Sequence, residues 1–215
     1  MNDSRTIDWY FDFISPFAYL QFRILQILQA DRPDLNIHYK PVLFAALLQA
    51  NDHKGPAEIP IKRLMTYRYC HWYAKHHDID FKIPAAHPFN PLPLLRLAVA
   101  RECTASVLSQ LFNHVWVESA QDPLFYSLQE ICKLPGLEHA AEEVDQIEVK
   151  NMLRSYTDEA IAREVFGVPT IAIGEMLFWG LDMTEMAMEY LDYPGNFDHQ
   201  EYKRIAQLPI AKARI

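Results

Sequence analysis

Residues 7–20 read IDWYFDFISPFAYL, a stretch in which a strand runs directly into a helix. The first half is aromatic and β-branched, which is typical of a buried strand. Ser15 and Pro16 then begin a helix, because Ser is a favoured N-cap and Pro a favoured first helical residue. Such a junction exposes the N–H groups and the positive dipole end of the helix, which suit an anion. Taken alone, the segment favours an ordinary helix start.

The next residues extend this segment into a βαβ unit. Apolar residues recur with helical spacing over 16–30, and the sequence DRPD at 31–34 ends that helix. Residues 35–41, LNIHYKP, alternate in the manner of a second strand. Because a helix connects the two strands, we expect them to pair in parallel.

Helical patterns dominate from Val42 for more than a hundred residues. Residues 61–77 and 107–117 each carry an apolar stripe, which predicts helices that pack on helices. The stripes consist of Ile61, Leu64, Met65, Trp72 and Tyr73, and of Val107, Leu108, Leu111, Phe112, Val115 and Trp116. Residues 93–101 and 146–156 are predicted helices as well. Residues 158–165 are predicted to form a separate helix capped by Thr157.

Strand patterns return near the end of the chain. Residues 169–173 and 176–179 are predicted strands that pair as a hairpin across Gly174-Glu175, and residues 184–191 form the last predicted helix. This order predicts an α/β protein with a thioredoxin-like fold and a large all-helical insertion. We assign 1–42 and 158–205 to the thioredoxin-like domain, 43–157 to the inserted helical domain and 206–215 to a tail.

Composition narrows the classes of partner. The chain has 215 residues, of which 50% are hydrophobic and 13% aromatic, as expected for a well-packed globular core. The net charge of −8 comes without a basic cluster, so neither nucleic acid nor a membrane surface is an expected partner. No secretory signal and no apolar run long enough to span a bilayer are recognisable, so we expect a soluble, cytoplasmic protein.

The three cysteines, Cys70, Cys103 and Cys132, are odd in number and far apart. Neither a disulfide framework nor a zinc site follows from their spacing, and we expect buried or half-buried thiols. The histidines next to Cys70 do not have the spacing of metal ligands either. No metal site is predicted.

Four stretches carry a resemblance to a known family. They read YFDFISPFAYL (10–20), IHYKPVLF (37–44), IPIKRLMTYRY (59–69) and TDEAIAREVFGVPTIAIGEMLFWGLDM (157–183). The chain resembles the 2-hydroxychromene-2-carboxylate isomerase family, which is close to the kappa-class glutathione transferases and more distant from DsbA-like oxidases. The resemblance implies glutathione as cofactor, a small aromatic or conjugated substrate, and a homodimer.

Ser15 is the catalytic residue that the resemblance implies. Dithiol oxidases of this fold carry Cys-x-x-Cys at the helix N-terminus, where the helix dipole lowers the pKa of the first thiol. Here the four residues are Ser15-Pro16-Phe17-Ala18, so disulfide exchange by the chain's own sulfurs is excluded at this site. A thiolate brought by glutathione would meet the same dipole and accept a hydrogen bond from Ser15.

The remaining glutathione contacts also follow from the resemblance. The Val168-Pro169 bond is expected to be cis, with Val168 pairing glutathione as a short added strand. Asp182, with help from Thr184, is expected to bind the γ-glutamyl ammonium. Leu181 and Met183 depart from the polar and Arg residues of relatives on either side of that Asp.

Residues of the insertion complete the expected site. Lys62 matches a lysine that contacts the glycyl carboxylate, although a lone lysine on a helix is usually solvated. His53 stands where relatives carry Asn, and Asn51 is the alternative for that contact. Phe17 and Asn90 are assigned to the substrate pocket, with a turn between prolines as the alternative role for Asn90.

Three functions remain open at this point. The first is a glutathione-dependent isomerase in which a Ser-stabilised thiolate adds reversibly to a conjugated substrate. The second keeps the same site in a kappa-like transferase or peroxidase. The third is a redox-inactive DsbA-like binding module.

Overall fold

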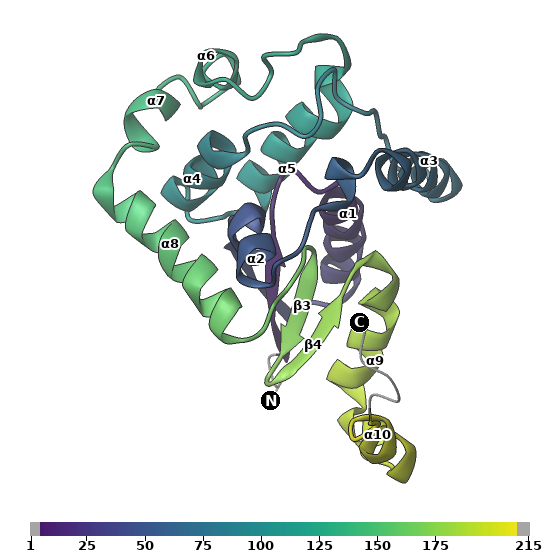
Figure 1. The fold of residues 1–215 in the computed structure, drawn as a ribbon. Coiled ribbons are helices and arrows are strands. Elements are labelled where there is room, and N and C mark those ends of the chain that lie inside the picture. Colours follow the sequence, from purple (N-terminus) through teal and green to yellow (C-terminus); the bar gives the residue numbers. More distant parts are fainter. Residues whose placement is uncertain (1–4, 210–215) are drawn as a thin grey trace.

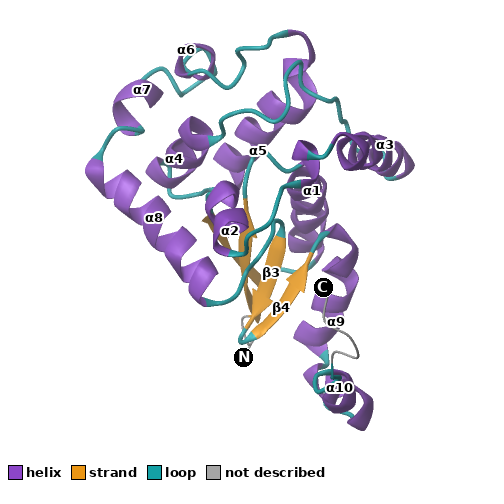
Figure 2. Ribbon diagram, viewed as in Figure 1, coloured by secondary structure: helices purple, strands orange, loops and turns teal. Residues whose placement is uncertain are grey.

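A four-stranded mixed sheet organises the computed structural model, which describes residues 5–209. The strands are β1 (Arg5–Phe11), β2 (Leu35–Pro41), β3 (Thr170–Ile173) and β4 (Met176–Trp179), in the order β2-β1-β3-β4. β1 pairs in parallel with β2 and antiparallel with β3, and β4 returns antiparallel to β3. The predicted parallel pair and the predicted hairpin are therefore both confirmed (Figure 2).

Helices cover both faces of the sheet (Figure 1). α1 (Pro16–Asp31) and α9 (Thr184–Asp192) lie on one face, and α2 (Phe44–Ala50) and α8 (Ile147–Ala162) on the other. The other helices are α3 (Pro60–His76), α4 (Leu92–Ala100), α5 (Ala105–Asn113), α6 (Leu128–Ile131), α7 (Ala140–Glu143) and α10 (Gln200–Ile205). α5 continues as a π-helical turn, His114–Glu118.

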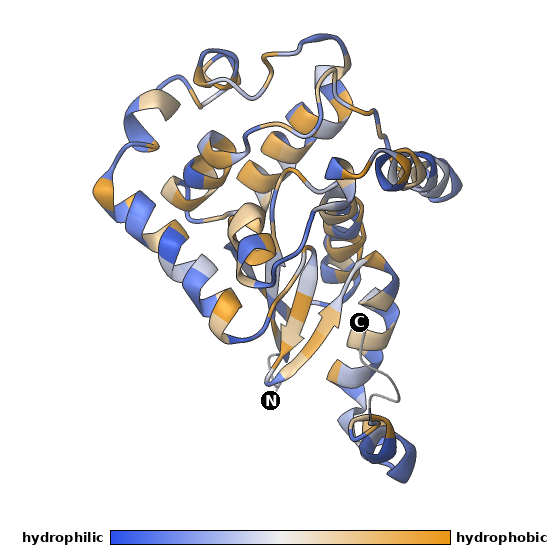
Figure 3. Cartoon of the chain, in the orientation of Figure 1, coloured by the Kyte–Doolittle hydropathy of each residue, from blue (hydrophilic) through white to orange (hydrophobic). Residues whose placement is uncertain are grey.

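The two faces of the sheet bury two hydrophobic clusters, because successive side chains of a strand point to opposite sides. Trp9 and Phe11 of β1 stack in the larger cluster, with ring centroids 4.6 Å apart, and Phe112 of α5 packs against both. Tyr10 points the other way, into a smaller cluster with residues of α2 and α8. Hydrophobic residues are prominent on β3, β4 and α5 in Figure 3, whereas α10 is mostly hydrophilic.

One predicted helix boundary was wrong. α8 runs without interruption through Thr157, which was expected to cap a separate helix. The buried Thr157 hydroxyl donates to the Leu153 carbonyl at 2.9 Å and accepts from the Leu43 N–H at 3.1 Å. Thr157 therefore joins α8 to the start of α2, because its side chain satisfies a backbone donor in another segment.

The apolar stripe of α3 was expected to pack against other helices, and this was wrong for most of its members. Ile61, Met65 and Trp72 are 64%, 56% and 57% exposed. The stripe of residues 107–117 packs in the core as predicted: Val107 is partly buried, and its other members, in α5 and the turn that follows, are buried. The thiols also match expectation, since Cys70 and Cys103 are buried and Cys132 is partly buried.

Within residues 5–209, no helix combines the length and apolarity needed to cross a bilayer. The domain boundaries drawn from the sequence stay a prediction. Of the predicted tail, residues 210–215 lie outside the described part of the chain.

Candidate active site

Ser15 caps α1 at the carboxyl end of β1. Its Oγ accepts a hydrogen bond from the Ala18 N–H at 3.2 Å, which is the N-cap interaction expected from the sequence. The same Oγ lies 3.4 Å from the carbonyl oxygen of Val168. That distance is long for a hydroxyl donor, so the proton is only weakly engaged and is available to a better acceptor.

Val168 faces Ser15 from the start of the β3 segment. The Val168-Pro169 bond is cis, as the family resemblance implied. Among the described residues, the Val168 N–H has no hydrogen-bond partner, while its carbonyl faces the Ser15 hydroxyl. An unpaired backbone donor with a neighbouring carbonyl is what an extended peptide uses when it adds to a sheet.

The turn that carries Asp182 is hydrogen-bonded to the Val168-Pro169 segment. The Gly180 N–H donates to the Pro169 carbonyl at 2.9 Å, and the exposed Asp182 follows in a short helical turn, Leu181–Met183. The structure thus brings Ser15, Val168 and the Asp182 turn to the same end of the sheet, where β1 and β4 end and β3 begins. A carboxylate exposed there can pair with an ammonium group.

Thr184 is occupied by internal contacts. Its hydroxyl donates to the Leu181 carbonyl at 2.6 Å and accepts from Gln21 Nε2 at 2.8 Å. Gln21 also donates to the Gly180 carbonyl at 3.0 Å, while its Oε1 accepts from Trp9 Nε1 at 2.7 Å. Gln21 is fully buried in α1 and was missed by sequence reasoning; a polar residue among the apolar positions of that helix was the available signal.

Asp12 is a second residue that sequence reasoning missed. It is buried, and its carboxylate accepts from the N–H groups of Ile14 and Phe44, each at 3.0 Å. Its own carbonyl accepts from the Ser15 N–H at 3.1 Å. Burial raises the pKa of Asp12 to about 7, against the opposing effect of the two N–H donors. An acid at the end of an aromatic strand was the signal in the sequence.

Side chains of the insertion hold the same loop from the other side. Trp116 Nε1 donates to the Phe13 carbonyl at 3.0 Å. His87 Nε2 lies 2.7 Å from the Ile14 carbonyl, and His87 Nδ1 lies 2.7 Å from the Tyr67 hydroxyl. The backbone from Asp12 to Ser15 is therefore held by side chains from distant parts of the sequence.

The predicted residues of the insertion are more loosely placed. Lys62 is exposed in the first turn of α3, and Asn51 and His53 are exposed in the turn after α2. Among the described residues, no hydrogen bond joins any of the three to Ser15. The link between α3 and the Ser15 loop runs through Tyr67 and His87 instead.

The two residues assigned to the substrate pocket also differ in setting. Phe17 is half-buried in the first turn of α1, with its ring 6.0 Å from that of Tyr69 on α3. Asn90 is exposed, and its side chain accepts from the Leu92 N–H at 3.1 Å. That contact is the turn role weighed as the alternative.

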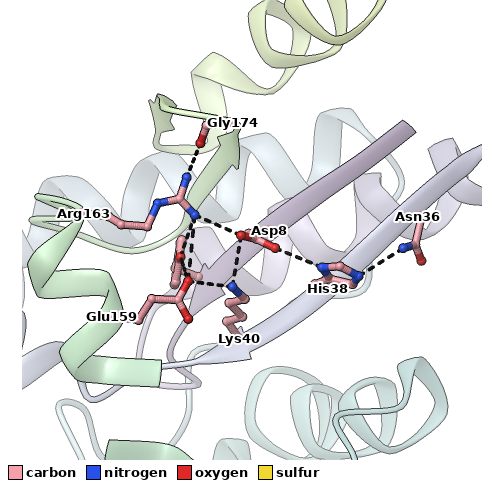
Figure 4. Close-up of polar contacts among 8 residues, drawn as sticks. Asp8, Asn36, His38, Lys40, Glu159, Arg163 and Gly174 are labelled. Carbon is pink, nitrogen blue, oxygen red and sulfur yellow. Dashed lines mark hydrogen bonds and ion pairs between the residues drawn. The ribbon is translucent and has the colours of Figure 1, made fainter. Parts of the chain in front are cut away.

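A separate charged network lies between β1, β2 and α8 (Figure 4). Asp8 accepts from Lys40 at 3.0 Å and from Arg163 at 2.9 Å, and Lys40 also donates to Glu159 at 2.7 Å. Arg163 further contacts the Gly174 carbonyl in the β3–β4 turn. Because the charges satisfy one another, the network is suited to hold α8 against the sheet rather than to take a ligand.

Comparison with known proteins shows similarity in sequence over most of the chain. Residues 6–192 match the model of the DSBA-like thioredoxin domain. A 2-hydroxychromene-2-carboxylate isomerase from Pseudomonas putida is 29% identical over 190 residues, covering 85% of this chain and 93% of the relative. Glutathione S-transferase kappa 1 from Caenorhabditis elegans is 23% identical over 214 residues, covering 87% and 91%.

A solved structure extends the likeness to three dimensions. A 2-hydroxychromene-2-carboxylate isomerase superposes with a TM-score of 0.74 at 26% identity, covering 89% of this chain and 98% of the other. The predicted α/β class, a thioredoxin-like fold with a helical insertion, is thereby confirmed. The chain belongs to the DsbA-like thioredoxin domain family, with 2-hydroxychromene-2-carboxylate isomerases and kappa-class glutathione transferases among its relatives.

Proposed function

We propose that this protein is a glutathione-dependent isomerase of the 2-hydroxychromene-2-carboxylate isomerase type. The observation that carries the proposal is the Ser15 hydroxyl at the N-terminus of α1, 3.4 Å from the carbonyl oxygen of Val168, a residue whose N–H has no partner in the described chain. These groups fit a cysteinyl peptide, because they offer a thiolate partner and a strand-pairing edge together.

Each residue then has a defined task. Ser15 donates its O–H to the sulfur and, with the α1 dipole, favours the thiolate. Val168 pairs the peptide backbone, Asp182 meets the α-ammonium, and Lys62 attracts the glycyl carboxylate. When bound, glutathione supplies the nucleophilic sulfur that adds reversibly to a conjugated carbon.

The proposed glutathione contacts differ in how strongly their positions in the structure support them. A 3.4 Å contact joins Ser15 to Val168, and a hydrogen bond joins Pro169 to Gly180 at the start of the Asp182 turn. Lys62 and His53, in contrast, are exposed on separate segments of the insertion. Thr184 would act through its hold on the turn at Leu181. We therefore assign Thr184 a supporting role and keep His53, with Asn51 as its alternative, as proposed contacts.

Calorimetric titration with glutathione tests the proposal. Wild type is expected to bind, and binding is expected to persist in Ser15→Ala while isomerisation of 2-hydroxychromene-2-carboxylate falls. No binding by wild type contradicts the glutathione role. Unchanged turnover by Ser15→Ala contradicts the role of Ser15 alone.

A kappa-like transferase or peroxidase is the second candidate, favoured by the kappa-class relatives. It uses the same site but consumes glutathione, whereas isomerisation returns it. Measuring free thiol before and after complete turnover separates the two: a stoichiometric loss assigns conjugation or peroxide reduction.

A redox-inactive binding module is the remaining alternative, because neither Ser15 nor Ala18 is a cysteine. A ligand well above its dissociation constant raises the stability of the native state. Absence of thermal protection by glutathione, together with absence of turnover, favours this module.

A homodimer also belongs to the proposal. Its support is the exposed stripe of α3 formed by Ile61, Met65 and Trp72, since apolar patches of this kind mark interaction surfaces. Sedimentation of wild type and Trp72→Lys tests it, with dissociation expected in the variant. The cytoplasmic location expected from the sequence stays a prediction.

A further inference from the structure

His87 reaches the Ser15 loop from the segment that joins α3 to α4. It is mostly withdrawn from solvent, and both ring nitrogens have partners within hydrogen-bond distance. Nε2 lies 2.7 Å from the Ile14 carbonyl, and Nδ1 lies 2.7 Å from the Tyr67 hydroxyl. A histidine with two specific partners is built into the structure and is not a solvated side chain.

The partners determine where the ring proton lies. A carbonyl oxygen only accepts, so Nε2 carries the proton and donates to Ile14. Burial and the nearby Arg63 guanidinium lower the pKa of His87, while the bond to Ile14 opposes that shift. The neutral ring therefore leaves Nδ1 as an acceptor, and the Tyr67 hydroxyl donates to it.

The Ile14 carbonyl belongs to the peptide bond that leads into Ser15. Asp12 holds the Ile14 N–H at 3.0 Å, so both polar groups of Ile14 are held by ionisable side chains. A hydroxyl that must meet a sulfur within hydrogen-bond distance depends on the orientation of its backbone, and an error of an ångström is costly.

We propose that His87 is a positioning residue for Ser15, and that Tyr67 fixes the His87 tautomer from α3. Through these contacts, the position of α3 affects the orientation of Ser15, whose hydroxyl stabilises the thiolate at the N-terminus of α1. This role rests on the proposed function, because it assigns Ser15 a sulfur to stabilise. The contact geometry itself is independent of any ligand.

The first test uses the protein without glutathione. The amide resonances of Ser15 and Ala18 report the loop and the cap, because the Ala18 N–H donates to Ser15 Oγ. His87→Leu removes the donor to Ile14, whereas His87→Gln replaces it with an amide N–H of similar reach. His114→Leu is the matched control, since His114 Nε2 lies 2.7 Å from the Phe125 carbonyl elsewhere in the chain.

We expect His87→Leu to shift both amide resonances and speed their exchange with solvent, His87→Gln to restore them, and His114→Leu to leave them in place. Unmoved Ser15 and Ala18 amides in His87→Leu overturn the proposal, as does a His87→Gln variant that behaves like His87→Leu. If His87→Leu does not fold, Tyr67→Phe replaces it: displaced Ser15 and Ala18 amides support the proposal and unmoved ones overturn it.

The second test measures the ionisation constant of the thiol in bound glutathione by its ultraviolet absorbance. Loss of a well-placed hydrogen bond to the thiolate corresponds to roughly a tenfold lower ionisation constant in His87→Leu. In a Ser15→Ala background the His87 change is expected to add nothing, because it acts through Ser15. Additive effects overturn the proposal. Failure of wild type to bind glutathione contradicts the proposed function alone, and the amide measurement then decides the role of His87.

Discussion

The hydroxyl oxygen of Ser15 lies 3.4 Å from the carbonyl oxygen of Val168, although 153 residues separate them in sequence. The contact joins the N-terminus of α1 to the cis Val168-Pro169 bond. Ser15 already accepts from Ala18, so its role as an N-cap is filled while its proton remains only weakly engaged. One side chain can therefore cap the helix and donate to a ligand.

The buried Asp12 carboxyl is expected to make stability fall as the pH rises toward neutrality. Burial raises its folded-state pKa from 3.8 to about 7, so between those values the unfolded chain has lost the proton and the folded chain retains it. The unfolded state binds fewer protons in that window, and the free energy of unfolding therefore falls with pH, by at most about 4 kcal/mol.

Denaturant unfolding of wild type and Asp12→Asn at pH 4 to 7 checks this slope. The stability of wild type relative to Asp12→Asn is expected to fall across the window, since Asn does not titrate. A difference that is independent of pH would show that Asp12 ionises in the folded protein as it does in the unfolded chain.

The charged network of Figure 4 is expected to support stability without touching the active site. Asp8→Asn removes the negative charge that pairs with Lys40 and Arg163 and is expected to cost about 1–2 kcal/mol at neutral pH. Burial alone raises the pKa of Asp8, but hydrogen bonds from its partners hold it below 3.8. The wild-type advantage is therefore lost as the pH falls through that lowered value.

Urea unfolding and glutathione titration of the Asp8 variant provide the measurements. Asp145→Asn is the control, because Asp145 pairs with Lys150 at 2.8 Å but is 70% exposed, and a small effect is expected there. A large change in glutathione affinity in Asp8→Asn would contradict a purely structural network.

The Thr157 hydroxyl is expected to matter more than its methyl group. Thr157→Val leaves the Leu43 N–H without its acceptor and is expected to cost about 1–2 kcal/mol, whereas Thr157→Ser keeps the hydroxyl and costs less. Thermal or urea unfolding of both variants measures this. A loss in Thr157→Ser as large as the loss in Thr157→Val would contradict the greater weight of the hydroxyl.

Lys62 is expected to contribute a modest, salt-dependent share of glutathione affinity. It is exposed, so its pairing with a carboxylate is worth less than about 1 kcal/mol, and Lys62→Met is expected to weaken binding by at most roughly fivefold. Lys75→Met is the control for a non-specific effect of losing one positive charge, because Lys75 is an exposed lysine in the last turn of the same helix. Similar losses in both variants would remove the specific role of Lys62.

The sheet and its attached helices were predictable because each rests on local signals. Ser15-Pro16 marks the start of α1, and Gly174, with φ of +56°, marks the hairpin turn. Thr157 misled for a physical reason: Ser and Thr cap helices by bonding backbone N–H groups, and here the N–H belongs to Leu43, a partner 114 residues away.

The residues that hold the site in place could not be predicted from the sequence, because their partners also lie far away along the chain. Asp12, Gln21 and His87 act through bonds to backbone groups of other segments, and no spacing along the chain encodes those partners. For α3, the sequence predicted the helix but not the exposure of its apolar stripe. Its periodicity predicted a helix correctly, but periodicity does not say whether an apolar face meets its own chain.

Stabilisation of the glutathione thiolate by Ser15 is measured by the pKa of the thiol in bound glutathione. Ser15→Ala is expected to raise it by about one unit or more while weakening binding less, because the lost hydrogen bond favours only the thiolate. Ser127→Ala, which removes the N-cap of α6, controls for cap loss and is expected to leave this pKa unchanged. An unaltered thiol pKa in Ser15→Ala, or a wild-type protein that does not lower it from its value in free glutathione, would contradict the account.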